Sequence, residues 1–510
     1  MFTGRHPRLV IFAVVILLLN LVVAAGVHQS RDDFDRAWGP AYKSRPHIPG
    51  SSQVFLQTKK SSRRMLQRWN HIAIDASGLD HTPVKPGENR VFGEQLGPCR
   101  ASRAIAIVHI AMFEALNAID ASFQSFTGLY EATPRTSKEA AIAQAAHDTL
   151  VAMFPSQKTS FDNQLALDLS DIDSGKKKKN GIALGQSAAF SILARRIGDG
   201  SETHEPLVNV EWLTSDQPGK WRQDPISKIP LALGAHWGDV RPFVLQSSSQ
   251  FRTPPPPAMS SAAYATAYNE VKRVGGDGVI TPTERTAEQT QIGIYWAYDG
   301  TPSLCAPPRL YNQITNLIAD QMGSDDIELA RLLALVNVAM ADAGIAVWES
   351  KYFYNFWRPI GGVREADPGT GPTGIGDDNP ATTCDPTFSP LGAPASNLQG
   401  PNFTPPFPAY PSGHAGFGGA LFQTLRNFYG TDRIPFTFVS DELNGSTKDN
   451  KGNTRPLVPR SFATLSQAEE ENGQSRIYLG IHWSFDKSEG IAQGRKVADW
   501  VFTHAFLPAQ

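Results

Sequence analysis

The sequence has little of what marks several protein classes. Only three of its 510 residues are cysteine, too few and too scattered for a disulfide framework or a zinc cluster. The 47 Lys and Arg residues nearly balance the 49 Asp and Glu residues, which leaves a formal net charge of −2. Without a basic excess, nucleic acid is not expected as a partner. With 41% hydrophobic and 19% charged residues, the composition is that of a globular enzyme.

A long hydrophobic run occurs only near the N-terminus, at residues 9–25, where Asn20 is the single polar residue. Arg5 and Arg8 precede it and small residues end it, which predicts a signal peptide over residues 1–25 that is cleaved before Gly26. An uncleaved membrane anchor stays open, because the run is close to the minimum length for a span. We expect a secreted protein, periplasmic or at the cell surface if the segment is retained. We expect no membrane contact in the mature form and no later spanning segment.

Export would allow one disulfide and would leave one thiol over, and the sequence does not choose among Cys99, Cys305 and Cys384. Apolar residues at helical spacing dominate from residue 63 onward, and no sustained alternation of period two is evident. The proline run 254–257 is the best candidate boundary. The sequence therefore predicts an all-α fold of two helical bundles packed side by side, with long functional loops. The expected lobes are 26–257, and 258–510 with the functional site.

The first of three informative blocks carries Lys351 and Arg358, which are seven residues apart. A helix would place both cations on one face, because seven residues are about two turns. Pro359 predicts that this helix stops at Arg358. Taken alone, two such cations are more often a solvated helix face than a site.

The second block is Pro411-Ser412-Gly413-His414, followed by an apolar helical stretch. Ser412 is a favourable N-cap, and the free N–H groups of a helix N-terminus attract anions. Gly413 would let an anion approach the backbone closely. His414, in the first turn, could exchange a proton beside that anion.

The third block contains Arg476, His482 and Asp486. His482 and Asp486 are four residues apart and would be neighbours on a helix, where the carboxylate can accept the Nδ1–H of the imidazole and leave Nε2 free for a metal or a phosphorus atom. A break near Gly480 would let Arg476 reach the same point. Together the blocks supply two Arg, one Lys, two His, an N-cap and a backbone N–H, a set suited to a tetrahedral oxyanion such as phosphate or vanadate.

The spacings Lys-x6-Arg-Pro, Pro-Ser-Gly-His and Ser-Arg-x5-His-x3-Asp resemble the shared signature of vanadium-dependent haloperoxidases and type 2 phosphatidate or acid phosphatases. Residues 234–243, 264–272, 285–290 and 296–299 resemble the haloperoxidase branch, so the resemblance covers about residues 63–505. It implies a vanadium-dependent haloperoxidase that oxidises chloride, bromide or both with hydrogen peroxide to hypohalite, through a peroxovanadate on one histidine. An organic acceptor is left open.

By this resemblance, His482 would be the one protein ligand of vanadium, bound through Nε2 and oriented by Asp486. His414 would be the acid–base residue, and Asp299 would brace one of the arginines. The vanadate oxygens would be held by Lys351, which would also polarise peroxide, and by Arg358, Arg476, the Ser412 hydroxyl and the Gly413 N–H.

Two further residues bear on the halide. Phe407 and Trp348 match residues that chloroperoxidases use where bromoperoxidases tend to carry His and Arg. An apolar wall there would strip water from the halide, which favours chloride with bromide also accepted. Ordinary packing of two aromatic rings is the simpler explanation.

Two other functions remain open. A secreted acid phosphatase of the same superfamily would use His482 as nucleophile and His414 as the acid for the leaving alcohol. A non-catalytic oxyanion-binding protein is the second, although it would need no proton relay. The sequence leaves open the preferred halide, the organic substrate and the oligomeric state.

Overall fold

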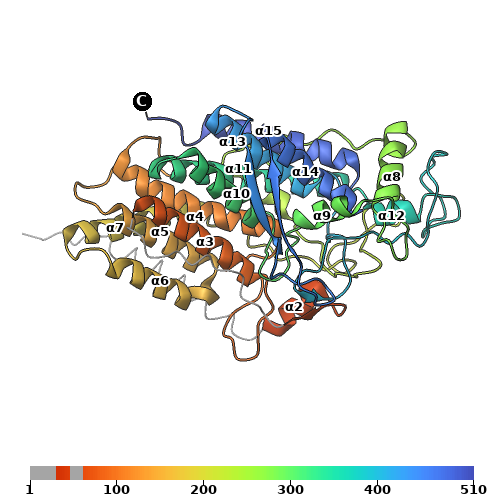
Figure 1. The fold of residues 1–510 in the computed structure, drawn as a ribbon, viewed down its shortest axis with the longest axis horizontal. Helices are drawn as coiled ribbons and strands as arrows, with labels where there is room; N and C mark the ends of the chain where they lie inside the picture. Colours follow the sequence, from red (N-terminus) through yellow and green to blue (C-terminus); the bar gives the residue numbers. More distant parts are fainter. Residues whose placement is uncertain (1–29, 46–60, 510) are drawn as a thin grey trace, which may run out of the picture.

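The computed structural model describes residues 30–45 and 61–509. The predicted signal peptide and the cleavage point before Gly26 lie outside these residues. The all-α prediction is confirmed, because the described chain is mostly helical (Figure 1). The first helices are α2 (Ser30–Trp38), α3 (Ser62–Asp80), α4 (Gly97–Asp120), α5 (Lys138–Met153), α6 (Lys158–Ser170) and α7 (Lys176–Arg196). They are followed by α8 (Ala262–Val274), α9 (Ala287–Tyr295), α10 (Pro308–Met322), α11 (Asp326–Tyr354), α12 (Pro359–Arg364), α13 (Gly413–Tyr429), α14 (Leu465–Tyr478) and α15 (Ser484–His504).

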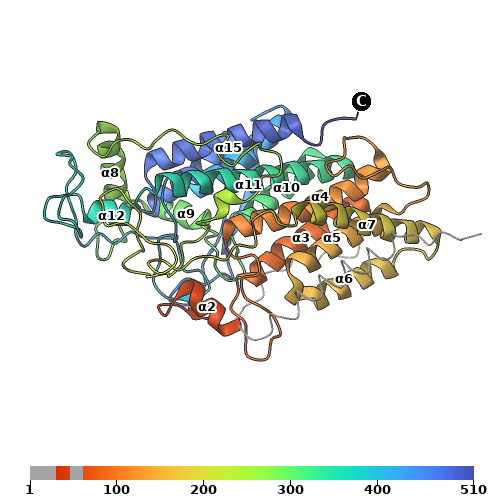
Figure 2. The ribbon, with the colours of Figure 1, turned by 180° about the vertical axis from the view of Figure 1, so that it is seen from behind.

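The helices form two groups that lie side by side. Figures 1 and 2 show α3 to α7 on one side and α10, α11 and α13 to α15 on the other. Helix α11 joins the groups, because it packs against α4 as well as against α13 and α15. One large hydrophobic core contains residues from both groups, from Met65 to Phe506. The boundary at residues 254–257 stays a prediction.

Within the described residues, α4 and α11 are long and apolar enough to span a bilayer by length and composition. The expectation that no later segment has this character is therefore wrong. In each helix, 94% of the apolar window is buried inside the fold, so their hydrophobicity matches their place in the core.

Two small antiparallel sheets interrupt the helical architecture. Strands β1 (Lys43–Ser44) and β2 (Leu398–Gln399) pair near α2, and β3 (Phe436–Asn444) pairs with β4 (Leu457–Phe462). The sequence analysis missed β3, although its first five residues alternate buried and exposed, the period of a half-buried strand. This strand positions a loop of the site. Glu442 accepts the N–H of Tyr298 at 3.1 Å, and the Ser440 hydroxyl donates to the carbonyl of Tyr295 at 2.6 Å.

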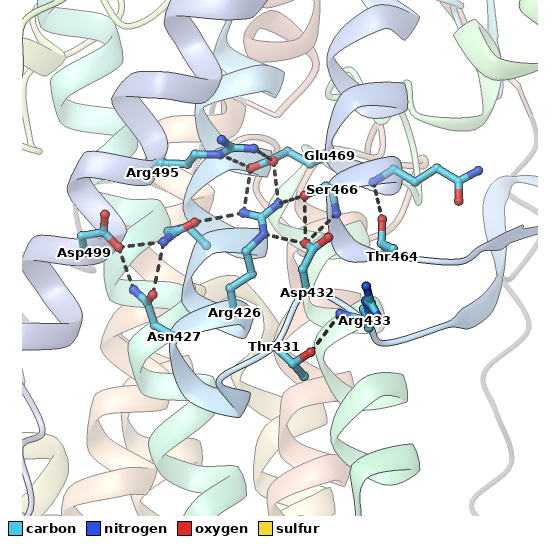
Figure 3. A network of polar contacts seen from close by, with 12 residues as sticks. Arg426, Asn427, Thr431, Asp432, Arg433, Thr464, Ser466, Glu469, Arg495 and Asp499 are labelled. Atoms are coloured by element: carbon cyan, nitrogen blue, oxygen red, sulfur yellow. Dashed lines mark hydrogen bonds and ion pairs between the residues drawn. The ribbon is translucent and has the colours of Figure 1, made fainter.

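Charged side chains around the buried Glu469 tie together the three C-terminal helices that carry the second and third blocks (Figure 3). Arg426 of α13 donates to Glu469 of α14 at 2.7 Å and to Asp432 at 2.7 Å, and Arg495 of α15 contacts the same Glu469. Glu469 is buried, so losing either arginine would leave a poorly compensated buried charge. The network fixes α13 and α15, whose N-terminal ends contribute to the site, and α14, whose last turn carries Arg476.

All three cysteines carry free thiols in the structure. Cys99 and Cys305 are buried, and Cys384 is partly buried.

Candidate oxyanion site

Lys351 and Arg358 are both buried, but they do not lie on one helix face as predicted. Helix α11 ends at Tyr354, and Asn355 follows in the left-handed conformation with a φ of 52°. Arg358 instead precedes Pro359 as the N-cap residue of the short helix α12. The prediction failed because the helix ends at Tyr354, well before Arg358, and the chain that turns at Asn355 brings the two cations together.

The Arg358 guanidinium is anchored on two sides. Its Nε donates to the carbonyl of Phe407 at 3.0 Å, and its Nη1 donates to the carbonyl of Ile481 at 2.9 Å and to Nε2 of His482 at 3.0 Å. Its Nη2 is buried and has no hydrogen-bond partner among the described residues. The side chain is therefore fixed, with one donor left over.

Lys351 differs from Arg358 because the N–H groups of its ammonium are bonded to backbone carbonyls. The ammonium donates to the carbonyls of Pro408 and Ala409, both at 2.9 Å, and to the carbonyl of Pro411 at 2.5 Å. Burial, together with the neighbouring Arg358, lowers the pKa of Lys351 well below its usual range. The lysine thus fastens α11 to the loop that leads into α13.

Ser412 and Gly413 begin helix α13 as predicted. The Ser412 hydroxyl accepts the N–H of Ala415 at 3.4 Å, as an N-cap does. A Cβ atom on Gly413 would lie 3.0 Å from Cη2 of Trp348, closer than real Cβ contacts normally come. Any larger residue at this position would therefore have to displace the Trp348 ring by a few tenths of an ångström.

His414 lies in the first turn of α13 and is held by the loop after α9. Its Nε2 donates to the carbonyl of Ala297, and the same nitrogen is 3.9 Å from Oδ1 of Asp299. Burial, followed by the positive charge of Arg476, lowers the pKa of His414 well below 6.5. The imidazole is therefore neutral at physiological pH in this structure.

Arg476 lies in the last turn of α14 and forms an ion pair with Asp299, as expected. Nη2 of Arg476 is 2.6 Å from Oδ1 of Asp299, and both side chains are buried. Nε and Nη1 of Arg476, and Oδ2 of Asp299, have no partner among the described residues. The predicted break is present, because α14 ends at Tyr478 and Gly480 has a φ of +72°.

His482 and Asp486 are in contact, but not as neighbours within one helix. His482 precedes Trp483, the N-cap residue of α15, and Asp486 lies in the first turn. Oδ2 of Asp486 accepts the Nδ1–H of His482 at 2.8 Å and the N–H of Trp483 at 3.0 Å. Burial and the nearby Arg358 lower the pKa of His482 well below 6.5. A neutral ring with its proton on Nδ1 presents the lone pair of Nε2.

The group that we call the cage consists of Lys351, Arg358, Ser412, Gly413, His414, Arg476 and His482. Among the described residues, some of its cationic donors have no acceptor. In the described part of the chain, Arg358 Nη2 and Arg476 Nε and Nη1 are buried and unpartnered. Such donors are costly unless an acceptor satisfies them, and an oxyanion would. A cavity brings members of the second and third blocks together with Asp299 and two aromatic rings, since its wall includes Trp348, Phe407, Gly413, His414, Arg476 and His482. Lys351, Arg358, Ser412 and Asp486 do not line this wall, although Arg358 and Asp486 both contact His482, which does.

The sequence analysis did not find the rest of this cavity. Its wall also includes Trp38 of α2, Leu231 and Phe403, which lie far apart in the sequence. Nor did it find the carbonyl of Ala297 as the partner of His414. No local pattern marks these positions, because the three-dimensional fold alone brings them to the site.

The fold is shared with bacterial vanadium haloperoxidases. A structure described as the first bacterial vanadium-dependent iodoperoxidase superposes with a TM-score of 0.68 at 23% identity, covering 89% of this chain and 99% of that chain. A holo-type bacterial vanadium-dependent chloroperoxidase gives 0.58 at 17% identity, covering 82% and 94%. At these identities the similarity shows the fold alone.

Sequence comparison finds a family model and a relative of higher identity than these structures. Residues 331–509 match the family model described as VCPO second helical-bundle domain. The chain is 31% identical over 506 residues to vanadium chloroperoxidase of Curvularia inaequalis, covering 82% of this chain and 78% of that protein. The chain therefore belongs to the vanadium chloroperoxidase family of haloperoxidases.

Proposed function

We propose that this protein binds vanadate in the cage and uses hydrogen peroxide to oxidise halide to hypohalite. The observation that carries the proposal is a set of buried N–H groups of Arg358 and Arg476 that have no partner among the described residues and lie beside the Nε2 lone pair of His482. Cationic donors arranged in this way fit the oxygens of a tetrahedral anion, and an oriented imidazole fits its metal.

When bound, vanadate supplies a Lewis acid that activates hydrogen peroxide toward halide without a change in its own oxidation state. His482 would hold vanadium through Nε2, the nitrogen that Arg358 contacts in this structure, and Asp486 keeps the ring proton on Nδ1. Arg358, Arg476, the Ser412 hydroxyl and the Gly413 N–H would hold the oxygens.

Lys351 contributes its charge and its hold on the loop at residues 408–411. Because its N–H groups are bonded to three carbonyls, direct polarisation of peroxide requires one of these bonds to open. His414 handles the peroxide proton. Its lowered pKa keeps the ring neutral and able to accept that proton.

For the halide we propose chloride and bromide. The rings of Phe407 and Trp348 lie 4.8 Å apart, and the Arg358 guanidinium lies 5.0 Å from the Phe407 ring centre. Aromatic carbon so close to the cage excludes water from the halide path. Among the similar proteins, one is named a chloroperoxidase and another an iodoperoxidase, so only assay can rank the halides.

The test is halogenation of monochlorodimedone by the purified protein with peroxide and either chloride or bromide, with and without orthovanadate. Activity that requires vanadate is expected, and it should survive His204→Ala, because that histidine is exposed. No halogenation with any halide in the vanadate-loaded protein would refute the proposal. Phosphate-ester turnover by the vanadate-free protein, quenched by vanadate, would instead support an acid phosphatase with His482 as nucleophile.

A further inference from the structure

The wall of the cavity at the cage also includes residues that the proposed halide chemistry does not use. Outside the cage this wall is built mainly from aliphatic, aromatic and proline carbon. Its members come from distant parts of the chain and include Trp38, Ile229, Leu231, Phe403, Pro405 and Pro406. A surface of this kind binds apolar molecules, because their contact removes carbon from water.

The wall offers almost no charge outside the cage. Apart from Asp299 and the cage residues, His81 is its only acidic or basic side chain among the described residues. Both ring nitrogens of His81 are engaged, since Nδ1 contacts the carbonyl of Ser77 at 2.8 Å and Nε2 accepts the N–H of Gly97 at 2.9 Å. The wall therefore favours a neutral ligand over a charged one.

One polar group at the cage end is available to such a ligand. Oδ1 of Asp299 is used by Arg476, whereas Oδ2 is buried without a partner in the described chain. A carboxylate oxygen accepts hydrogen bonds only, so Oδ2 suits an O–H or N–H donor on the ligand.

We propose that this cavity binds a neutral, electron-rich aromatic molecule with one hydrogen-bond donor, such as a phenol, as the organic acceptor of the halogen. This inference rests on the proposed function for its oxidant. In the transfer step hypohalous acid halogenates the ring, so a carbon–halogen bond forms as the oxygen–halogen bond breaks. The displaced ring proton and the hydroxide leave as water.

Trp38 is the specificity-determining residue of this wall. Its ring meets the rings of Phe403 at 5.1 Å and Tyr42 at 5.0 Å in edge-on contacts. Helix α2 is further fixed where Phe34 and Trp38 pack into a small core with Leu231 and Leu398. An N-terminal segment, distant from the signature blocks in sequence, thus shapes the acceptor end of the cavity.

The first experiment measures binding in protein prepared without vanadate, by titration calorimetry with 2-naphthol. Wild-type protein should bind saturably, and Trp38→Ala should weaken binding about tenfold through lost contact area. Leu231→Trp should also weaken it, by filling the cavity. This variant adds bulk, so it tests the cavity even if the loss of Trp38 loosens α2. Arg36→Ala is the matched control, because Arg36 lies on the same helix with its side chain 45% exposed.

The second experiment loads the protein with vanadate and compares the brominated isomers of 2-naphthol with those from reagent hypobromite. A different isomer ratio that moves toward the reagent ratio in Trp38→Ala supports the proposal. Absence of saturable binding, or wild-type binding by both Trp38→Ala and Leu231→Trp, would overturn it. Bromide oxidation followed as tribromide, without any organic acceptor, separates the two claims. Naphthol binding without this oxidation supports the cavity assignment and counts against the proposed function.

Discussion

Replacing Arg476 by methionine should weaken vanadate binding about 10²- to 10⁴-fold. The side chain is fully buried, and its Nε and Nη1 are the donors that the described chain leaves without an acceptor. Each charge-assisted hydrogen bond contributes roughly 1.5–3 kcal/mol, so losing two removes about 3–6 kcal/mol, which converts to that range of affinity. Arg476→Lys keeps the charge but not the planar pair of donors, so it should lose less vanadate affinity than Arg476→Met.

Two further effects of Arg476→Met follow from the same contacts. Asp299 would be left buried without its cation, and burial already raises the pKa of its carboxyl. In the folded variant the pKa of Asp299 would lie above its value in the unfolded chain. The free energy of unfolding should therefore be smaller at pH 8 than at pH 5, because the fold must bury an unpaired carboxylate once Asp299 ionises. The pKa of His414 should rise toward its usual value, since Arg476 is the main charge that lowers it.

Equilibrium dialysis against orthovanadate, with vanadium measured in the protein, gives the affinity. Arg103→Met is the control, because Arg103 forms a buried ion pair with Asp199 at 2.8 Å and is not on the cavity wall. It should lower stability without changing vanadate affinity. Equal vanadate affinity in wild type and Arg476→Met would refute the assignment of its free donors to the anion.

Four other substitutions test separate parts of the reasoning. His482→Ala should leave the fold intact and abolish stoichiometric vanadium uptake, and metal analysis showing one vanadium per chain at wild-type affinity would make the ligand assignment wrong. His414→Ala should retain vanadate and lose about 10²- to 10⁴-fold in halide oxidation, with the acid limb of the pH–rate profile removed; an unchanged profile would mean that another group carries the proton. Burial lowers the pKa of His109 from 6.5 to about 4, so below pH 6.5 the unfolded chain binds more protons than the fold. The free energy of unfolding should therefore fall by about 3 kcal/mol between pH 6.5 and 4; denaturant titrations should show a shallower decline in His109→Asn, and equal slopes would contradict this. Phe407→His should lower the ratio of chloride to bromide oxidation by admitting water, and a ratio that stays constant in paired assays would show that the ring only packs.

The sequence predicted local features where a single residue type decides them. Ser412 caps α13 because its hydroxyl satisfies a free N–H. Gly480 allows the chain to turn between α14 and α15 because it adopts a positive φ. The three blocks were also expected to converge, and their members do so. Local features of this kind can be predicted because they depend on the chemistry of only a few neighbouring residues.

Predictions that extrapolated a regular helix through a block failed. Lys351 and Arg358 approach each other across a chain reversal at Asn355, and His482 stands before the helix that carries Asp486. In each case spacing alone did not reveal where the helix ended. The paired residues still lie close to each other, because tertiary packing fixes their side chains without a continuous helix.

The cage also has a consequence for how the protein is prepared. Lys351, Arg358 and Arg476 are buried together, and the arginines keep donors that no other residue in the described part of the chain satisfies. An anion bound only by the folded chain raises its stability, by about 2.7 kcal/mol at one hundred times its dissociation constant. Phosphate has the same tetrahedral shape, so phosphate buffer should protect the protein from heat while competing with vanadate for the cage. Protein purified in phosphate should therefore look well folded and assay as inactive until the buffer is exchanged.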